Sequence, residues 1–306
     1  MKIYGIFGDP IEHSLSPAMQ NAALLAMGME ACYHAFRVGE DKLKDALLGA
    51  RAMGFSGLNL TIPLKEKALM IGVLEPDPLA RAIKAVNTIS FSDRGILGYN
   101  TDGWGASLAL QEAGVSVRGR KVLIIGAGGA ARAIAYTLKQ EGSEILIANR
   151  SLKRAEELAA QIGAEGYDIS DLKSLAARSE IIINCTSVGM REGDPRLLEQ
   201  DSFSEGQAVF DIVYNRETEL LQDARRAGAV ARDGAMMLVY QGALVLLAGL
   251  ISPILSPLAV AQMGCAGGII IFALGLNLLK ITSIKVADLL PAILLAPFIS
   301  LLTGLL

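Results

Sequence analysis

The chain has 306 residues, enough for two domains with separate cores, since domains commonly contain about 100–200 residues. A formal net charge of −3 and an aromatic content of 5% argue against a surface that binds nucleic acid. The three cysteines lie far apart in the sequence and form no CxxC pair, so we expect neither disulfides nor a metal site, and we place the protein in the reducing cytoplasm.

Short apolar runs alternate with charged segments of helical period from residue 1 to about residue 233, a pattern that predicts an α/β fold. The predicted strands cover residues 2–8, a run that ends at 57–60, and residues 121–126, 144–149, 180–186 and 208–214. The predicted helices cover residues 17–27, 41–53, 103–113, 130–141 and 152–162. We expect a first domain over residues 1–102, a second over 103–234 with a cleft between the two, and a separate apolar helical tail over 235–306.

Small polar side chains form four motifs in the first domain. Ser14 and Ser16 flank one leucine just before a proline, and two hydroxyls on one extended turn suit a carboxylate. The structural alternative makes Ser16 the N-cap of the following helix. The other motifs are NLTIPLK, AVNT and GYNTDG, at residues 59–65, 85–88 and 98–103. Together they supply the amide, hydroxyl, amine and carboxylate groups expected in a site for a polyhydroxylated acid.

A glycine-rich turn joins an apolar strand to a helix in KVLIIGAGGAARAIAYTLKQ, the context that a dinucleotide fingerprint requires. Gly126 permits the tight turn, Gly128 lets the backbone approach a pyrophosphate, and Ala131 allows the helix to pack closely. Phosphates are expected at the helix N-terminus, where backbone N–H groups lack partners. The second domain is therefore predicted to be Rossmann-like.

The next predicted strand ends in Asn149-Arg150-Ser151, where an NAD-specific enzyme usually carries an acidic residue. The missing acid favours NADP, and Arg150 and Arg154 are candidates to hold its 2′-phosphate through charge-assisted contacts. In the alternative, Lys153 and Arg154 only solvate a helix face.

The strings SLSP, NLTIPLK, AVNT, GYNTDG, GAGGAARA, NRSLKRA, NCTSVGM, FDIVYN and MLVYQGA, in this order, resemble the shikimate dehydrogenase family over about residues 1–243. The resemblance implies an NADP-dependent enzyme that interconverts shikimate and 3-dehydroshikimate, with the substrate-binding domain first and the NADP-binding domain second. It implies that Lys65 and Asp102 form the catalytic pair. The residues implied to bind substrate are Ser14, Ser16, Asn59, Thr61, Asn87, Asp102, Tyr214 and Gln241. Together with the glycine turn, it gives a cofactor site made of Gly126, Gly128, Gly129, Ala130, Ala131, Asn149, Arg150, Ser151, Arg154, Thr186, Ser187, Met190 and Gly234.

Oxidation of a secondary alcohol requires hydride loss from carbon and proton loss from the hydroxyl, so an acid–base group has to lie beside the substrate. A lysine amine oriented by a carboxylate suits this role, and we expect Lys65 and Asp102 to share it as a coupled pair. The structural alternative is an exposed lysine beside an aspartate that caps a helix.

The tail departs from that family, and no charged residue occurs between Asp233 and Lys280. Three apolar runs, residues 243–261, 264–279 and 289–306, predict helices that associate with a membrane. Strings such as LSPLAVAQM and IKVADLLPA resemble the C-terminal end of a family of small membrane proteins of unknown function. The alternative is a pair of buried helices that completes the enzyme core.

Two alternative functions remain. In the first, the enzyme acts on quinate as its substrate. In the second, the chain is a membrane protein that carries an inactive dehydrogenase-like domain. We expect a small-molecule substrate, NADP as the cofactor, no nucleic-acid partner, a monomer or homodimer, and a catalytic part in the cytoplasm with a membrane contact through residues 244–306.

Overall fold

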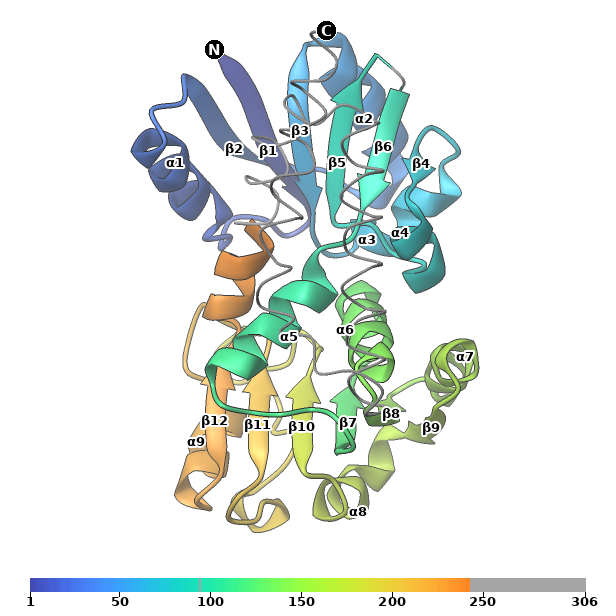
Figure 1. The fold of residues 1–306 in the computed structure, drawn as a ribbon, viewed down its shortest axis with the longest axis vertical. Helices are drawn as coiled ribbons and strands as arrows, with labels where there is room; N and C mark the ends of the chain where they lie inside the picture. Colours follow the sequence, from blue (N-terminus) through green and yellow to red (C-terminus); the bar gives the residue numbers. More distant parts are fainter. Residues whose placement is uncertain (94, 243–306) are drawn as a thin grey trace, which may run out of the picture. The chain divides into compact units, whose positions relative to one another are not determined.

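The computed structural model describes residues 1–93 and 95–242, which form two six-stranded sheets with helices packed on them (Figure 1). These residues belong to one unit of the chain. The predicted membrane-associated runs over residues 243–306 lie outside the described residues. Within the described part, no helix is both long enough and apolar enough to cross a membrane.

The first sheet has the strand order β2-β1-β3-β5-β6-β4 and is mixed. Its strands are β1 (Lys2–Gly8), β2 (Ala31–Arg37), β3 (Phe55–Leu60), β4 (Glu75–Pro76), β5 (Thr88–Ser92) and β6 (Gly95–Tyr99). Its helices are α1 (Ser16–Ala26), α2 (Leu43–Ala52), α3 (Leu64–Lys67) and α4 (Pro78–Ile83), with 3-10 turns η1 (Glu40–Lys42) and η2 (Ala68–Met70).

The pairing of this sheet brings three chain segments to one edge. β5 runs antiparallel to both β3 and β6, so the start of β5 lies beside the end of β3 and the end of β6. In register, Thr88 faces Asn59 on one side and Tyr99 on the other. The motifs that follow or precede these strand ends, at residues 59–65, 85–88 and 98–103, are therefore collected at one place.

The second sheet is parallel throughout and has the order β12-β11-β10-β7-β8-β9. Its strands are β7 (Lys121–Ile125), β8 (Glu144–Asn149), β9 (Glu165–Asp168), β10 (Ile181–Asn184), β11 (Ala208–Asp211) and β12 (Val230–Asp233). The helices are α5 (Asp102–Glu112), α6 (Gly129–Gln140), α7 (Leu152–Ile162), α8 (Leu172–Ala177) and α9 (Glu219–Arg226), with 3-10 turns η3 (Ile169–Asp171) and η4 (Gln200–Ser202). This is the doubly wound order of dinucleotide-binding domains, whose ligand site lies where the order reverses, here between β7 and β10.

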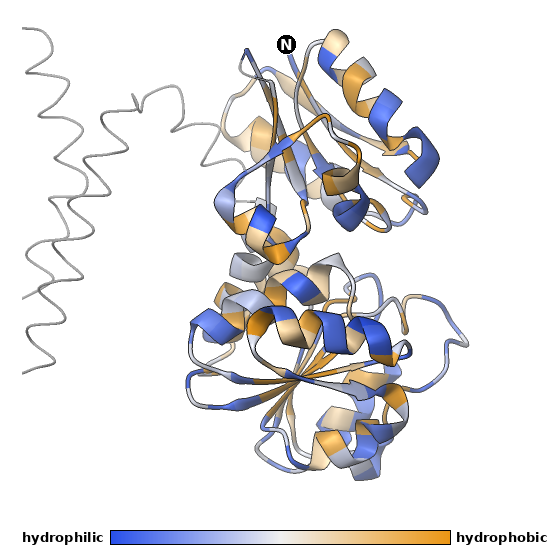
Figure 2. Cartoon of the chain, turned by 90° about the vertical axis from the view of Figure 1, so that its right-hand side faces the viewer, coloured by the Kyte–Doolittle hydropathy of each residue, from blue (hydrophilic) through white to orange (hydrophobic). Residues whose placement is uncertain are grey.

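Both faces of the second sheet are buried. Val122 and Ile124 of β7 pack in one core and Leu123 and Ile125 in the other, because successive side chains of a strand point to opposite faces. The hydrophobic strands of this sheet lie between helices that contain both hydrophilic and hydrophobic residues (Figure 2). Such burial explains why these strands are continuous apolar runs in the sequence.

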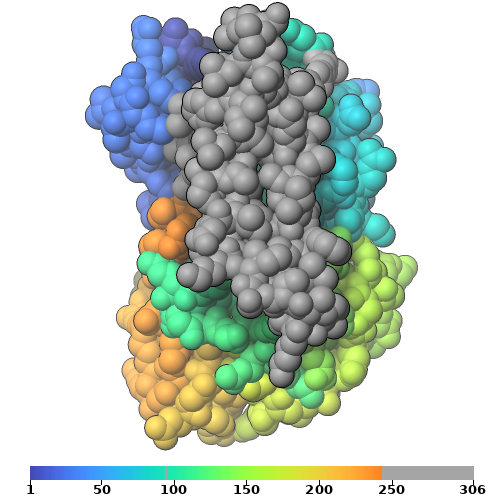
Figure 3. Space-filling model, viewed as in Figure 1, coloured from blue at the N-terminus to red at the C-terminus, as the bar shows by residue number. Residues whose placement is uncertain are grey.

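Two close contacts tie the parts of the described chain together. A Cβ added to Gly103 at the start of α5 would lie 2.1 Å from Thr137 Oγ1 and 2.6 Å from Ala133 O, so α5 and α6 pack where only glycine fits. Helical residues 235–242 return to α1, where a Cβ on Gly242 would lie 2.7 Å from Met19 Cε (Figure 3).

The predicted elements differ from the observed ones at their ends, and several observed strands and the helices α3, α4, α8 and α9 were not predicted. The five predicted helices correspond to α1, α2, α5, α6 and α7, and α2 begins at Leu43 because residues 40–42 form a 3-10 turn. The strand predicted to reach residue 214 is shorter, since β11 ends at Asp211. β2, β4, β5, β6, β9 and β12 were not among the predicted strands.

Candidate active site

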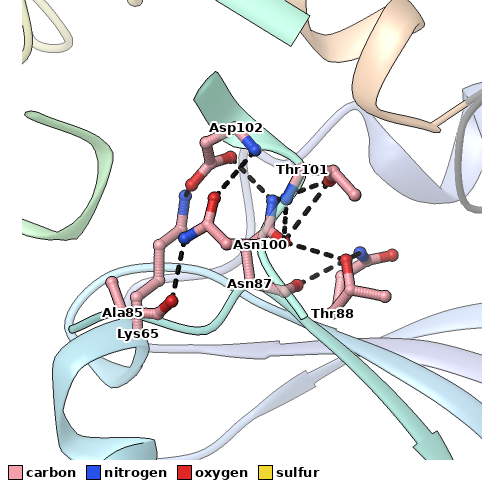
Figure 4. A network of polar contacts seen from close by, with 8 residues as sticks. Lys65, Ala85, Asn87, Thr88, Asn100, Thr101 and Asp102 are labelled. Atoms are coloured by element: carbon pink, nitrogen blue, oxygen red, sulfur yellow. Dashed lines mark hydrogen bonds and ion pairs between the residues drawn. The ribbon is translucent and has the colours of Figure 1, made fainter. Parts of the chain in front are cut away.

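Lys65 and Asp102 form an ion pair although 37 positions separate them in sequence. Lys65 lies on α3, just after β3, and Asp102 is the first residue of α5. Lys65 Nζ lies 2.6 Å from Asp102 Oδ2, and the side chains are only 14% and 1% exposed (Figure 4). A charge-assisted contact of this length in a site with little water fixes the position of the amine. The alternative of an exposed lysine beside a capping aspartate is wrong, because the pair is buried and Asp102 caps no helix with its side chain.

Asn87 orients the Asp102 carboxylate. Its Nδ2 donates to Asp102 Oδ1 at 2.8 Å, while its Oδ1 accepts from Thr101 N at 3.0 Å and from Thr88 Oγ1 at 2.9 Å (Figure 4). Because a backbone N–H occupies the oxygen, the amide of Asn87 has one orientation in which all its contacts are made. The Asp102 carboxylate therefore faces a donor on each of its oxygens.

Asn100 holds the start of α5 in place. Its Oδ1 accepts from Asp102 N at 3.0 Å, and its Nδ2 donates to Ala85 O at 3.0 Å (Figure 4). The AVNT and GYNTDG motifs are thus joined by buried amide contacts, which explains why asparagine recurs in both.

Asn59 extends this polar network across the first sheet. The hydroxyl of Tyr33 on β2 donates to Asn59 Oδ1 at 2.8 Å, and Asn59 Nδ2 donates to Asn87 O at 3.2 Å. Burial raises the pKa of Tyr33, so its hydroxyl stays protonated and keeps its role as a donor. Thr61 is half-buried just beyond the end of β3, on the side of Gly8.

Ser14 of the SLSP motif lies near Tyr214, which follows β11. Ser14 Oγ accepts from Ser16 N at 3.3 Å. Burial raises the pKa of Tyr214, and hydrogen bonds with Ser14 and with the Leu15 backbone act in the opposite direction. The N-cap alternative for Ser16 is wrong, because α1 begins at Ser16 itself and its cap position is Leu15, without a side-chain cap.

Gln241 has an unsatisfied acceptor. Its Oε1 is buried and finds no hydrogen-bond partner within the described part of the chain. A buried acceptor of this kind is costly unless a donor reaches it, and a hydroxyl group of a small molecule would satisfy it.

The turn between β7 and α6 has the shape that a dinucleotide requires. Gly126 has a φ of 112°, a conformation that favours glycine, and an added Cβ would lie 3.1 Å from Thr186 Cγ2 and 3.2 Å from Cys185 O. An added Cβ on Gly129 would lie 2.8 Å from Lys65 Cβ. The glycine turn and the lysine of the ion pair are therefore in direct contact.

The segment after β8 contains the N-cap of α7 and two arginines, of which Arg154 is paired. Asn149 Nδ2 donates to Ser151 O at 3.1 Å, and Ser151 Oγ accepts from Arg154 N, which makes Ser151 the N-cap of α7. Arg150 is exposed. Arg154 does not merely solvate a helix face, because its Nη2 lies 2.8 Å from Glu66 Oε1.

Thr186 belongs to a hydrogen-bonded loop that follows β10. Its hydroxyl donates to Asn184 Oδ1 at 2.7 Å and accepts from Val188 N at 3.1 Å. Ser187 is exposed and Met190 half-buried on the same loop. Gly234 lies elsewhere, after β12, where an added Cβ would collide with Ile212 O at 2.3 Å.

Asp211 anchors this loop. Its carboxylate accepts from Asn184 Nδ2 at 2.9 Å, from Thr218 Oγ1 at 2.7 Å and from Val213 N at 3.0 Å. Burial raises the pKa of Asp211 to about 6. Burial, and then Asp211, raise the pKa of the Cys185 thiol, so Cys185 stays protonated and is no nucleophile.

Comparison with known proteins matches two families to separate parts of the chain. Residues 6–89 match the family described as shikimate dehydrogenase substrate binding domain, and residues 107–219 match the family described as shikimate / quinate 5-dehydrogenase. The shikimate dehydrogenase (NADP(+)) of Methanothrix thermoacetophila is 62% identical over 243 residues, which are 79% of this chain and 89% of that protein. The chain belongs to the shikimate dehydrogenase family.

Solved structures of this family have the same fold. The shikimate dehydrogenase of Aquifex aeolicus is 35% identical with a TM-score of 0.76, and the match covers 80% of this chain and 91% of that one. The Thermus thermophilus enzyme in complex with NADP(H) and shikimate is 36% identical with a TM-score of 0.74, and the match covers 80% of this chain and 92% of that one. Residues 227–301 match a different family, described as a protein of unknown function.

Two residues of this shikimate dehydrogenase family member were missed by sequence reasoning although they lie beside the Lys65–Asp102 pair and the glycine turn. Glu66 and Arg132 form an ion pair, with Arg132 Nε 3.3 Å from Glu66 Oε2. Arg132 lies inside the string GAGGAARA and Glu66 directly follows NLTIPLK, but a single charge on a helix carries no signal of its distant partner. Asp211, inside FDIVYN, was missed for the same reason.

Proposed function

We propose that this chain interconverts shikimate and 3-dehydroshikimate with NADP as the hydride acceptor or donor. The observation that carries the proposal is the contact between the buried Lys65–Asp102 pair and the glycine turn at Gly129. A dinucleotide on the turn and a substrate at the amine would then be neighbours, as hydride transfer requires. Family membership supports the same activity.

In the direction of oxidation, the ring hydroxyl loses its proton and the carbon that bears it loses a hydride. NADP, when bound, accepts that hydride. Lys65 Nζ, oriented by Asp102, forms the hydrogen bond to the reacting hydroxyl. As the ammonium group passes a proton to the Asp102 carboxylate, the resulting amine takes the proton of the hydroxyl, so that the pair gains one proton in total and returns it in the reverse direction. The proton is shared across the coupled pair, because the two groups lie 2.6 Å apart.

The polar groups around this pair are proposed to hold the substrate. Ser14, Ser16 and Tyr214 offer hydroxyls to the carboxylate. Gln241 offers its Oε1, which has no partner among the described residues, to a ring hydroxyl. The remaining proposed contacts to ring hydroxyls come from Asn59, Thr61, Asn87 and Asp102.

We propose a substrate domain over residues 1–102 and a cofactor domain over residues 103–234. The proposed cofactor residues all lie in the second of these domains. The turn and first helical residues would hold the pyrophosphate, namely Gly126, Gly128, Gly129, Ala130 and Ala131. Asn149, Arg150, Ser151 and Arg154 would hold the 2′-phosphorylated ribose, and Thr186, Ser187, Met190 and Gly234 would line the nicotinamide side. The pairing of Arg154 with the Glu66 carboxylate supports its capacity to bind an anionic group.

The test is an assay of shikimate-dependent NADP reduction, run beside NAD and beside quinate as the other substrate. We expect shikimate with NADP to give the highest kcat/KM. Equal or better turnover of quinate would reassign the substrate, and absence of turnover with every pair would reject the dehydrogenase function in favour of an inactive domain.

Lys65→Ala tests the catalytic assignment. We expect kcat to fall by about 10²–10⁴-fold with a modest change in KM, since the proton acceptor is lost while most binding groups remain. Lys67→Ala on the same helix is the matched control and should keep kcat within about twofold of the wild type. Wild-type kcat in Lys65→Ala would remove Lys65 from the mechanism.

We further propose that residues 244–306 attach a cytoplasmic catalytic part to a membrane. The support is the absence of charged residues between Asp233 and Lys280 and the three apolar runs over residues 243–261, 264–279 and 289–306. Fractionation of cells that express the full chain tests this. Release by detergent alone is expected, and recovery in the soluble fraction at physiological salt would contradict it.

A further inference from the structure

Glu66 links the helix of the catalytic lysine to two arginines of the second sheet. Glu66 follows Lys65 on α3, and its carboxylate receives Arg154 Nη2 at 2.8 and 3.1 Å and Arg132 Nε at 3.3 Å. Arg154 comes from the first turn of α7 and Arg132 from α6. A carboxylate with two guanidinium groups is the arrangement that these arginines would offer to any anion.

The carboxylate also lies over the glycine turn. A Cβ added to Gly128 would be 3.9 Å from Glu66 Oε1, and Arg154 Nη2 donates to Ala127 O at 3.2 Å. Gly128 is the cap position of α6, where N–H groups without partners and the helix dipole attract negative charge. Glu66 therefore lies beside the glycine turn and holds the guanidinium group proposed to bind the 2′-phosphate.

We propose that Glu66 stands in for the cofactor's 2′-phosphate on Arg154, and that NADP or NADPH has to displace it to bind. This inference rests on the proposed function, in which Arg154 binds that phosphate. A carboxylate and a phosphate repel each other at contact distance, so the two anions compete for the same guanidinium group. Glu66 thereby lowers the affinity for the phosphorylated cofactor, and NADH, which has no 2′-phosphate, does not need the exchange.

Arg132 explains how Glu66 can leave Arg154 without losing every partner. Arg132 is only 10% exposed and also donates to Gln161 Oε1 at 3.1 Å, whereas Arg154 is 48% exposed. The exposed arginine is the one free to turn to a ligand, and the buried one keeps the carboxylate. Because Arg132 keeps its contact with Glu66, the exchange costs less free energy than the loss of an isolated ion pair would.

The experiment compares Glu66→Gln with the wild type by calorimetric titration with NADPH and NADH. The Kd for NADPH should fall by about threefold to tenfold, because an exposed ion pair and a like-charge repulsion are both removed. The Kd for NADH should change by less than about twofold. Glu156→Gln removes the same charge from exposed α7, where Glu156 has no ion pair among the described residues, and should change neither.

A double-mutant cycle tests whether Glu66 lowers the affinity for NADPH through Arg154. In an Arg154→Ala background, Glu66→Gln should change the Kd for NADPH by less than about twofold, because the guanidinium group that the two anions share is gone. The probes 2′,5′-ADP and 5′-AMP should repeat the contrast, with only the first binding more tightly to Glu66→Gln. If Glu66→Gln does not fold by circular dichroism, Glu66→Met, which keeps the length of the side chain, replaces it.

The outcomes separate this inference from the proposed function. Weaker or unchanged NADPH binding in Glu66→Gln, with a wild type that prefers NADPH through Arg154, would overturn the competition and leave the cofactor assignment standing. A wild type that binds NADPH and NADH equally, and is unaffected by Arg154→Ala, would overturn the assignment of Arg154 and the inference with it.

Discussion

Asp102→Asn is the most informative single substitution, because the structure leaves the new amide no suitable orientation. Both carboxylate oxygens of Asp102 face donors, namely Lys65 Nζ at 2.6 Å and Asn87 Nδ2 at 2.8 Å. Asparagine has one acceptor in place of two, so one of these donors meets an N–H₂ group. Asn87 cannot turn over without giving up the contact from Thr101 N to its Oδ1 at 3.0 Å. The clash is therefore expected at Lys65.

The size of the effect follows from this geometry. A hydrogen bond to a charged group contributes about 1.5–3 kcal/mol, and a buried charge that loses its partner costs more, about 3–5 kcal/mol. Lys65 is 14% exposed and moves partly toward water, so we expect a loss between these two ranges, about 2–4 kcal/mol of unfolding free energy. A displaced catalytic amine lowers kcat by about 10²-fold.

Urea unfolding at pH 7 and steady-state oxidation of shikimate measure the two quantities on one preparation. Asp77→Asn is the matched control, because Asp77 is an N-cap that accepts from Ala80 N and asparagine caps helices equally well. We expect the control to remain within about 0.5 kcal/mol and twofold in kcat. If Asp102→Asn behaved like the control in both assays, the restraint of Lys65 by Asp102 would be refuted.

Three further predictions concern other parts of the described chain. Arg150→Ala should raise KM for NADPH by about tenfold while KM for NADH changes little, and an unchanged KM for NADPH would remove this residue from the cofactor site. The pKa of Asp211 is raised to about 6, so the native state holds its proton to higher pH than the unfolded chain does, and its contribution to the free energy of unfolding falls as pH rises from about 4 to 6. The stability of the wild type relative to Asp211→Asn should thus drop by about 2–3 kcal/mol between pH 4 and pH 7 in urea titrations, whereas a constant difference would contradict the buried carboxyl. Gly103→Ala should lower the free energy of unfolding by about 1–3 kcal/mol, because the new Cβ would lie 2.1 Å from Thr137 Oγ1. The control Gly49→Ala, with open space around it, should be neutral or stabilising. Equal melting temperatures of the two variants would exclude the close packing of α5 on α6.

Local patterns in the sequence were sufficient to predict those helices and strands whose own residues carry a clear hydrophobic or glycine pattern. β7, β8 and α6 are predicted because strands buried on both faces are continuous apolar runs, and because a glycine turn between such a strand and a helix has few other uses. The candidate residues Lys65 and Asp102 also come from the sequence, through short motifs whose order resembles one family.

Short strands with weak alternation of polar and apolar residues could not be predicted from the local sequence pattern. β5 and β6 carry few residues and alternate weakly, and β5 becomes a strand through its antiparallel neighbours β3 and β6. Register with a partner far along the chain leaves no local periodicity, so these strands were not predicted.

For the candidate site as well, some features could be predicted from the sequence and others required the tertiary structure. Residue types and their motifs indicated an amine, a carboxylate and a glycine turn, each from a different segment. Only tertiary structure decided that Lys65 lies 2.6 Å from Asp102, that Asn87 fixes the carboxylate, and that Glu66 pairs with Arg154 across 88 positions. The physical reason is that ion pairs and hydrogen bonds act over a few ångströms in space and are independent of distance along the chain, whereas a sequence pattern reports only on neighbours within a few turns or strand positions.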